Sequence, residues 1–355
     1  MGRITHVLHD NSRNDLFSIN DKRSIIVSIF YPTEVENTEL NETSYLELFD
    51  PCQEKATTIL EEMNFDIHFI RETKTKVHNN AKPNLHLNSY PIILYVPAFG
   101  VVRDMYIYHI QQLVDNGFIV VSIGSTYESM FSIFPEGLFV RQSEDISKIN
   151  STDFQFWREL LDTRVEDIYY VLNHLEEIQS QLTHEPIIFS SIGIVGHSLG
   201  GAAAIEVAAR DSRIEAGVLL DPSFHLMEFE ENIKLNTPFL IMRQEKCTYE
   251  ELRNELSEGI ITPYINGYQR LFTLFSKYNS FIKVREAHHM TFSDIPMLFN
   301  EEQISNKHKI ISIYATCFLC EFMKAETLSY QRLLGNKKNV EIVEVDIEGK
   351  PIGEI

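Results

Sequence analysis

The fold is decided by one stretch of this 355-residue chain, Ile192-Gly193-Ile194-Val195-Gly196-His197-Ser198-Leu199-Gly200-Gly201. An apolar β-type run enters a Gly-x-Ser-x-Gly pentapeptide, and the alanine-rich run 202–210 continues as a helix. A serine at so sharp a turn between strand and helix takes a strained backbone conformation, which requires neighbours without side chains two residues away on each side. Gly196 and Gly200 meet this requirement. We therefore interpret the stretch as a nucleophile elbow that presents Ser198 above a sheet.

Apolar strands and amphipathic helices alternate on both sides of this elbow. Short strands are expected at 24–31, 90–96, 118–123, 192–196, 215–220, 237–242 and 280–285. Helices are expected at 52–64, 104–116, 154–181, 199–210 and 304–334. Fully apolar strands connected through helices are typical of parallel sheets with right-handed crossovers. The sequence therefore predicts an α/β fold with a mostly parallel central sheet and helices on both faces.

The whole chain, 1–355, is expected to form a single domain with insertions. Residues 1–22 read as irregular apart from a short strand at 4–8, and the region 1–88 is only weakly assigned. The connection 124–153 has no regular pattern and resembles a lid, because long connections of this kind are usually functional. Residues 246–280 read as a mostly helical insertion. The charged positions of the helix 154–181, Arg164 and Asp167 among them, are interpreted as a solvated face.

Composition excludes several classes of partner. The chain carries 51 acidic against 31 basic residues, a formal net charge of −20, which disfavours nucleic acid and anionic membrane surfaces. No apolar run is long enough for stable membrane insertion, and residues 1–20 hold no apolar core of a secretory signal. Cys317 and Cys320 lie in an apolar helical stretch and are interpreted as buried thiols. We therefore expect a cytoplasmic protein without metal or cofactor.

Three residue types follow strands in the order that serine hydrolysis on an α/β sheet requires. This order is nucleophile, acid and base, each just past the carboxyl end of a strand. Ser198 follows the strand 192–196, Asp221 follows 215–220, and His288 and His289 follow 280–285. The catalytic residues are therefore expected to be Ser198 as nucleophile, Asp221 as acid and His289 or His288 as base. His197 is adjacent to the serine and is interpreted as a structural neighbour.

Two further parts of the site are expected from loops. The backbone amides of Leu199, directly after the nucleophile, and of Phe99, in the loop after the strand 90–96, are expected to form the oxyanion hole. Tyr127, Phe131 and Phe134 in the connection 124–153 are candidates for the substrate pocket, with packing of this loop onto its own domain as the alternative. Adjacent histidines on a strand point to opposite faces, so the pair 288–289 does not suggest a metal site.

These motifs resemble one known family. Gly196-His197-Ser198-Leu199-Gly200-Gly201, then Leu220-Asp221, then His289-x-x-Phe292-x-Asp294 are similar to the lipase-like platelet-activating factor acetylhydrolases, of the plasma and type II intracellular kind with bacterial relatives. The resemblance spans roughly 90–298. It implies the α/β-hydrolase fold and hydrolysis of short or oxidised acyl esters without calcium or a cofactor. The spacing to Phe292 and Asp294 favours His289 over His288 as the base.

The expected function is therefore hydrolysis of a short-acyl carboxylic ester, with phospholipid-like esters among the candidates, through an acyl-enzyme intermediate. A second interpretation keeps the same three residues but assigns a lactone, a natural-product ester or an acyl acceptor other than water. A third is a non-catalytic α/β-hydrolase that serves as a binding module. The intact serine, aspartate and histidine argue against the third.

Overall fold

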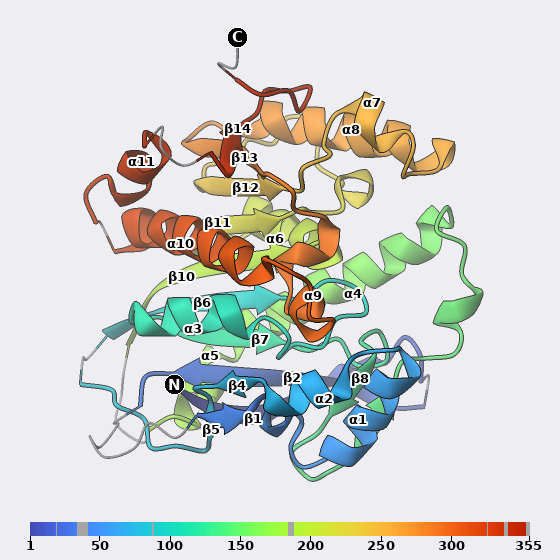
Figure 1. Ribbon diagram of the computed structural model, residues 1–355, viewed down its shortest axis with the longest axis vertical. Coiled ribbons are helices and arrows are strands. Elements are labelled where there is room, and N and C mark those ends of the chain that lie inside the picture. Colours follow the sequence, from blue (N-terminus) through green and yellow to red (C-terminus); the bar gives the residue numbers. More distant parts are fainter. Residues whose placement is uncertain are drawn as a thin grey trace.

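The computed structural model describes residues 1–18, 20–33, 42–86, 89–183, 188–324, 326–336 and 340–352. Within these ranges the main sheet has ten strands in the order β14-β13-β12-β11-β10-β6-β7-β2-β1-β5. Their bounds are β1 Gly2–Asn14, β2 Lys22–Tyr31, β5 His78–Asn79, β6 Ser89–Val96, β7 Ile119–Ile123, β10 Ile188–His197, β11 Ile214–Leu220, β12 Phe239–Arg243, β13 Asn279–Val284 and β14 Ile342–Glu344. Figure 1 shows them stacked from β1 near one end to β14 near the other.

Neighbouring strands from β7 to β13 pair in parallel, whereas β2, β1 and β14 join antiparallel. The expected mostly parallel sheet is therefore confirmed. Parallel strands place all their carboxyl ends at one edge of the sheet, where binding sites of such folds are found. The register pairs Val195 with Tyr95 on one side and with Val218 on the other. The elbow strand β10 thus lies near the middle of the sheet.

Helices cover both faces of the sheet (Figure 1). One apolar core joins the sheet to α3 (Ile107–Asp115) and α10 (Ile304–Met323), and the other joins it to α4 (Phe154–Asn173), α6 (Leu199–Arg210) and α8 (Glu258–Leu274). The remaining elements are β3 Thr43–Ser44, η1 Tyr45–Phe49, α1 Gln53–Glu62, α2 Ile67–Glu72, β4 Lys74–Thr75, β8 Phe131–Ile133, β9 Phe139–Arg141, η2 Ile146–Lys148, α5 Leu175–Ser180, η3 Phe224–Leu226, α7 Tyr249–Leu252, η4 His289–Phe292, α9 Ile295–Leu298 and α11 Ser329–Leu334. None of the described helices is long and apolar enough to cross a bilayer.

The N-terminal segment differs from the sequence-based expectation. The short strand expected at 4–8 is part of β1, a strand of 13 residues that also includes neighbours read as irregular and pairs with β2 from Gly2 opposite Tyr31 onward. Some of its buried positions are charged, and Arg3 pairs with Asp104 at 2.7 Å. Polar residues at buried positions hide the alternation by which a half-buried strand is recognised.

Three helical and loop predictions are also corrected. The helix expected at 154–181 divides at His174 into α4 and α5, and that expected at 304–334 divides into α10 and α11. The connection 124–153 contains the antiparallel hairpin β8–β9. Arg164 and Asp167 are buried, not solvated, because Arg164 pairs with Glu128 at 2.9 Å and Asp167 with Arg23 at 2.6 Å.

Candidate active site

The elbow forms as the glycine pattern predicts. β10 ends at His197, α6 begins at Leu199, and Ser198 between them has φ 54° and ψ −119°. A Cβ on Gly196 would lie 2.4 Å from the carbonyl oxygen of Gly200, and a Cβ on Gly200 would lie 2.3 Å from that of Val96. Both positions therefore exclude any side chain, and the strained conformation of Ser198 is imposed by its surroundings.

Asp221 and His289 are brought together by the ends of two different strands. Asp221 follows β11 directly and its side chain is 1% exposed, while His289 opens the turn η4 beyond β13. Nδ1 of His289 lies 2.7 Å from Oδ2 of Asp221. The neighbouring His288 points elsewhere, with its Nε2 3.2 Å from a carboxylate oxygen of Glu301.

The hydroxyl group of Ser198 faces a residue that the sequence analysis did not single out. Its Oγ lies 3.4 Å from Oγ of Ser223, and among the described residues it makes no hydrogen bond to His289. Ser223 also donates its backbone N–H to the carbonyl oxygen of Ser198, at 3.0 Å. Its position two residues after Asp221, in the loop beyond the strand, is the signal by which it could have been found.

The loop after β6 lies beside the elbow and holds the Phe99 amide. Arg164 donates to the carbonyl oxygen of Pro97 at 2.5 Å, and the amide of Ala98 donates to the hydroxyl of Tyr106 at 2.8 Å. In the described part of the chain, no acceptor is found for the amide of Phe99. The amide of Leu199 is the first of α6 and has no partner within the helix. Both amides are therefore free to donate to a ligand.

The histidine before the nucleophile is buried behind the site. His197 is fully buried, with Nδ1 3.0 Å from the hydroxyl of Tyr106 and Nε2 3.0 Å from the carbonyl oxygen of His289. Burial, together with the nearby His289 and Arg164, lowers the pKa of His197 well below its ordinary value. Its surroundings therefore favour the neutral form of His197.

The three expected pocket residues have different surroundings. Phe131 is fully buried against Phe49 and Phe139, with ring centroids 5.3 and 5.4 Å away, and Phe134 is also buried. Tyr127 has φ 67° and its ring lies 6.2 Å from that of Phe17. For Phe131, this placement matches the alternative in which the connection packs onto its own domain.

A small cavity lies between α4, η3 and α8. It measures about 200 Å³ and is lined by Phe154, Arg158, His225, Leu226, Glu228 and Pro263. None of the expected catalytic residues lines this cavity. Burial, and to a smaller extent His289, lowers the pKa of His225 to about 4, and its Nδ1 is buried without a hydrogen-bond partner among the described residues.

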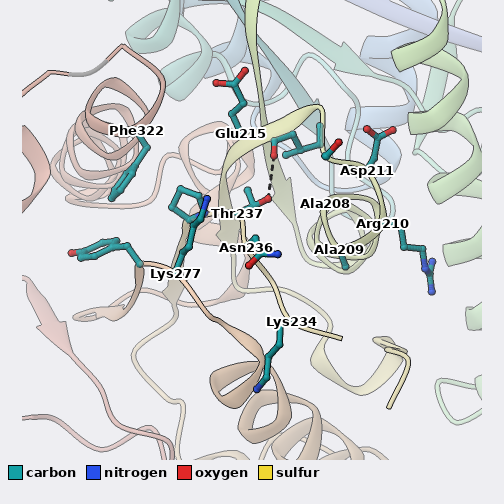
Figure 2. Close-up of a pocket in the computed structure, with 14 residues that line it drawn as sticks. Ala208, Ala209, Arg210, Asp211, Glu215, Lys234, Asn236, Thr237, Lys277 and Phe322 are labelled. Carbon is teal, nitrogen blue, oxygen red and sulfur yellow. Dashed lines mark hydrogen bonds between the residues drawn. The ribbon is translucent and has the colours of Figure 1, made fainter. Parts of the chain in front are cut away.

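A larger hollow of about 740 Å³ lies at the opposite edge of the sheet, where β11 and β12 begin (Figure 2). Figure 2 shows Asp211, Thr237 and Lys277 around it, and none of the expected catalytic residues lines it. The described residues also hold no group of three or more His, Cys, Asp or Glu side chains arranged for a metal ion.

The parallel sheet, the helices on both faces and the strained serine between β10 and α6 define an α/β-hydrolase fold. The structure is similar to that of a ferulic acid esterase from Streptomyces cinnamoneus, with a TM-score of 0.75 and 19% sequence identity over 97% of this chain and 96% of that one. This likeness shows the fold. The chain belongs to the family of platelet-activating factor acetylhydrolase, isoform II, which it matches over residues 12–312.

Two relatives are similar to this chain in sequence. A probable 1-alkyl-2-acetylglycerophosphocholine esterase of Arthroderma benhamiae is 25% identical over 224 residues, covering 60% of this chain and 54% of the relative. A platelet-activating factor acetylhydrolase of Cavia porcellus is 23% identical over 251 residues, covering 60% of this chain and 58% of the relative. The chain thus spans little more than half the length of the relatives that it matches. The expected family resemblance is confirmed.

Proposed function

We propose that this chain is a serine carboxylic-ester hydrolase that acts through an acyl-enzyme intermediate, with Ser198 as nucleophile, Asp221 as acid and His289 as base. The observation that carries the proposal is the 2.7 Å hydrogen bond between His289 Nδ1 and the buried carboxylate of Asp221, beside a serine with φ 54°. Membership of an acetylhydrolase family supports the same reaction class.

The Asp221–His289 hydrogen bond determines where the proton of the imidazole lies. An ionised carboxylate only accepts hydrogen bonds, so Nδ1 of His289 carries the proton and Nε2 keeps a lone pair. Nε2 then removes the proton of Ser198 as its Oγ attacks the ester carbonyl carbon, and later protonates the departing alcohol. A water molecule then attacks the acyl-enzyme while Nε2 removes its proton. Nε2 returns this proton to Ser198 Oγ as the carboxylic acid is released. The hydroxyl of Ser198 must first turn from Ser223 toward His289, a change of the kind that substrate binding often brings about.

The amides of Leu199 and Phe99 are proposed to stabilise the negative oxygen of the tetrahedral intermediate. Each is a backbone donor without a protein acceptor in the described residues, and each is held by a rigid neighbour, α6 or the Arg164-anchored loop. Removing one such donor typically costs about 10²–10³-fold in kcat. Because the donors are backbone N–H groups, they do not depend on the side chain at these two positions, except that proline would remove the donor.

Short acyl groups are the proposed substrate class. One relative is named for an ester of glycerophosphocholine whose acyl group is acetyl. Tyr127 and Phe134, which lie in the connection 124–153, remain candidates for a more distant part of the substrate.

A reducing compartment, the cytoplasm, is the proposed location. The four cysteines are free, and Cys317 and Cys320 lie within α10. Burial raises the pKa of Cys320 to about 12, which leaves its thiol unreactive. Alkylation of the protein isolated without reductant should modify four thiols after denaturation, whereas fewer than four would contradict this location.

The experiment that tests the function is a series of p-nitrophenyl esters from acetate to dodecanoate. We expect kcat/KM to be highest for acyl groups of a few carbons and to fall steeply beyond them, and Ser198→Ala to abolish turnover. Ser312→Ala, which removes a hydroxyl bonded to His308 within α10, is the matched control and should leave turnover unchanged. Turnover that persists in Ser198→Ala would contradict the assignment, and a preference for dodecanoate would contradict the short-acyl class.

A further inference from the structure

We propose that His197 is a positioning residue that locks the backbone of the base His289 to the oxyanion loop through Tyr106. This inference rests on the proposed function, because it assigns His289 the role of base. His197 directly precedes Ser198 in the chain, so its buried side chain connects the proposed nucleophile, base and oxyanion hole. The connection is carried by three hydrogen bonds of 2.8, 3.0 and 3.0 Å.

The direction of these three bonds follows from the groups at their two ends. The amide of Ala98 can only donate, so the hydroxyl oxygen of Tyr106 accepts. The proton of that hydroxyl is then available for Nδ1 of His197, which accepts it. At the other end, the carbonyl oxygen of His289 can only accept, so Nε2 of His197 carries the proton and donates it. The chain of donors is therefore satisfied by a single state of His197, the neutral Nε2–H tautomer.

The surroundings of His197 favour this single state. His197 and Tyr106 are fully buried and Ala98 is nearly so. The rings packed around His197 are those of Tyr106, His289 and Phe292, with centroids 5.9, 4.9 and 6.0 Å away. Burial and the adjacent His289 and Arg164 also disfavour a charged imidazole and lower the pKa of His197. A neutral ring with both nitrogens bonded has no alternative partners and holds its neighbours in one arrangement.

His197 itself does not reach the reacting atoms, so its effect on catalysis is through the positions of the groups that do. It fixes the carbonyl of His289, whose imidazole must meet Ser198 Oγ, and through Tyr106 it fixes the peptide that precedes the Phe99 amide. A misplacement of about 1 Å in such a site can cost about 10²-fold in rate. We therefore expect loss of the connection to lower kcat about 10–100-fold while KM changes less than threefold.

Kinetics of three variants test the connection. Tyr106→Phe and His197→Leu should each lower kcat by this amount, and His197→Gln, whose amide can still donate to the carbonyl of His289, should retain several-fold more kcat than His197→Leu. Tyr330→Phe is the matched control, since it removes another buried phenol bonded at 2.7 Å to Ser280 at the far end of β13, and should change kcat less than twofold. Equal losses in both Tyr→Phe variants, or a raised KM with unchanged kcat, would overturn the proposal.

A spectroscopic measurement tests the connection without turnover. In ¹⁵N-histidine-labelled protein, the long-range ¹H–¹⁵N signal that is missing in His197→Gln should be that of a neutral Nε2–H tautomer from pH 5 to pH 8. An Nδ1–H tautomer, or titration in this range, would overturn the proposal. The spectrum of Ser198→Ala should show the same signal. An inactive wild-type protein would therefore refute the proposed function while leaving this inference tested separately.

Discussion

Gly200→Ala probes the close contact on which the whole site depends. Gly200 is the second residue of α6, and a Cβ there would lie 2.3 Å from the carbonyl oxygen of Val96 and 2.4 Å from that of Pro97. Ordinary contacts of a Cβ begin near 3.4 Å, so α6 must move about 1 Å away from the end of β6. Because Val96 and Pro97 lead into the loop after β6, which holds Phe99, this movement separates the amide of Leu199 from that of Phe99.

Gly200→Ala is expected to have two effects, one on the stability of the fold and one on kcat/KM. Overpacking of this kind costs about 1–3 kcal/mol of stability, and the gain in helix propensity from Gly to Ala returns about 1 kcal/mol at most. The displacement of the oxyanion donors should lower kcat/KM about 10²-fold, equivalent to about 2.7 kcal/mol in the transition state. The loss of activity should therefore exceed the loss of stability.

The assay pairs esterase kinetics with urea unfolding, and the chain offers a matched control. Gly259 is the second residue of α8, and the nearest atom to a Cβ there is Cγ2 of Thr152, at 3.2 Å, the movable end of a side chain. Gly259→Ala should keep kcat/KM within twofold and change stability by less than about 1 kcal/mol. Wild-type activity and stability in Gly200→Ala would refute the claim that this contact shapes the site.

Three further predictions concern the carboxylates and histidines. Asp221→Asn should lower kcat about 10⁴-fold in the same assay, because an amide favours the wrong tautomer of His289; a loss below tenfold would contradict its role as acid. His289→Gln should lower kcat at least about 10⁴-fold and His288→Gln less than threefold, whereas the reverse order would move the base to His288. Burial raises the pKa of Asp294 to about 6, above the 3.8 of an unperturbed carboxyl, so the native state binds its proton more tightly than the unfolded chain. As the pH rises from about 4 to about 6, the free energy of unfolding should therefore fall by about 3 kcal/mol more in the wild-type protein than in Asp294→Asn. Urea unfolding measures this difference, and a parallel pH dependence of the two proteins would contradict it.

The parts of the fold that could be predicted from the sequence are those with a local signal. The apolar strands β6, β10 and β11 and the glycines of the elbow each carry their pattern within about ten residues. The order of Ser198, Asp221 and His289 along the chain then predicted which strand ends carry the candidate residues, although their roles still await experiment.

The missed features depend on partners far along the chain. Arg164 and Asp167 resemble a solvated helix face, and they are buried only because Glu128 and Arg23 supply opposite charges, 36 and 144 residues away from them. Only residues 4–8 of strand β1 were predicted for the same reason, since Arg3 is compensated by Asp104. The role of His197 depends on Tyr106, 91 residues away. Local periodicity cannot detect contacts of this range.

Covalent labelling of Ser198 tests the central claim most directly. The protein should be treated with a fluorophosphonate, digested and mapped by mass spectrometry, with Ser198→Ala and Asp221→Asn treated in parallel. The account predicts one adduct, on Ser198, formed much more slowly in Asp221→Asn and not at all in Ser198→Ala. Labelling without hydrolysis of simple esters would point to a lactone or an acyl acceptor other than water as the substrate. The absence of an adduct on the wild-type protein would contradict the account and favour a binding module.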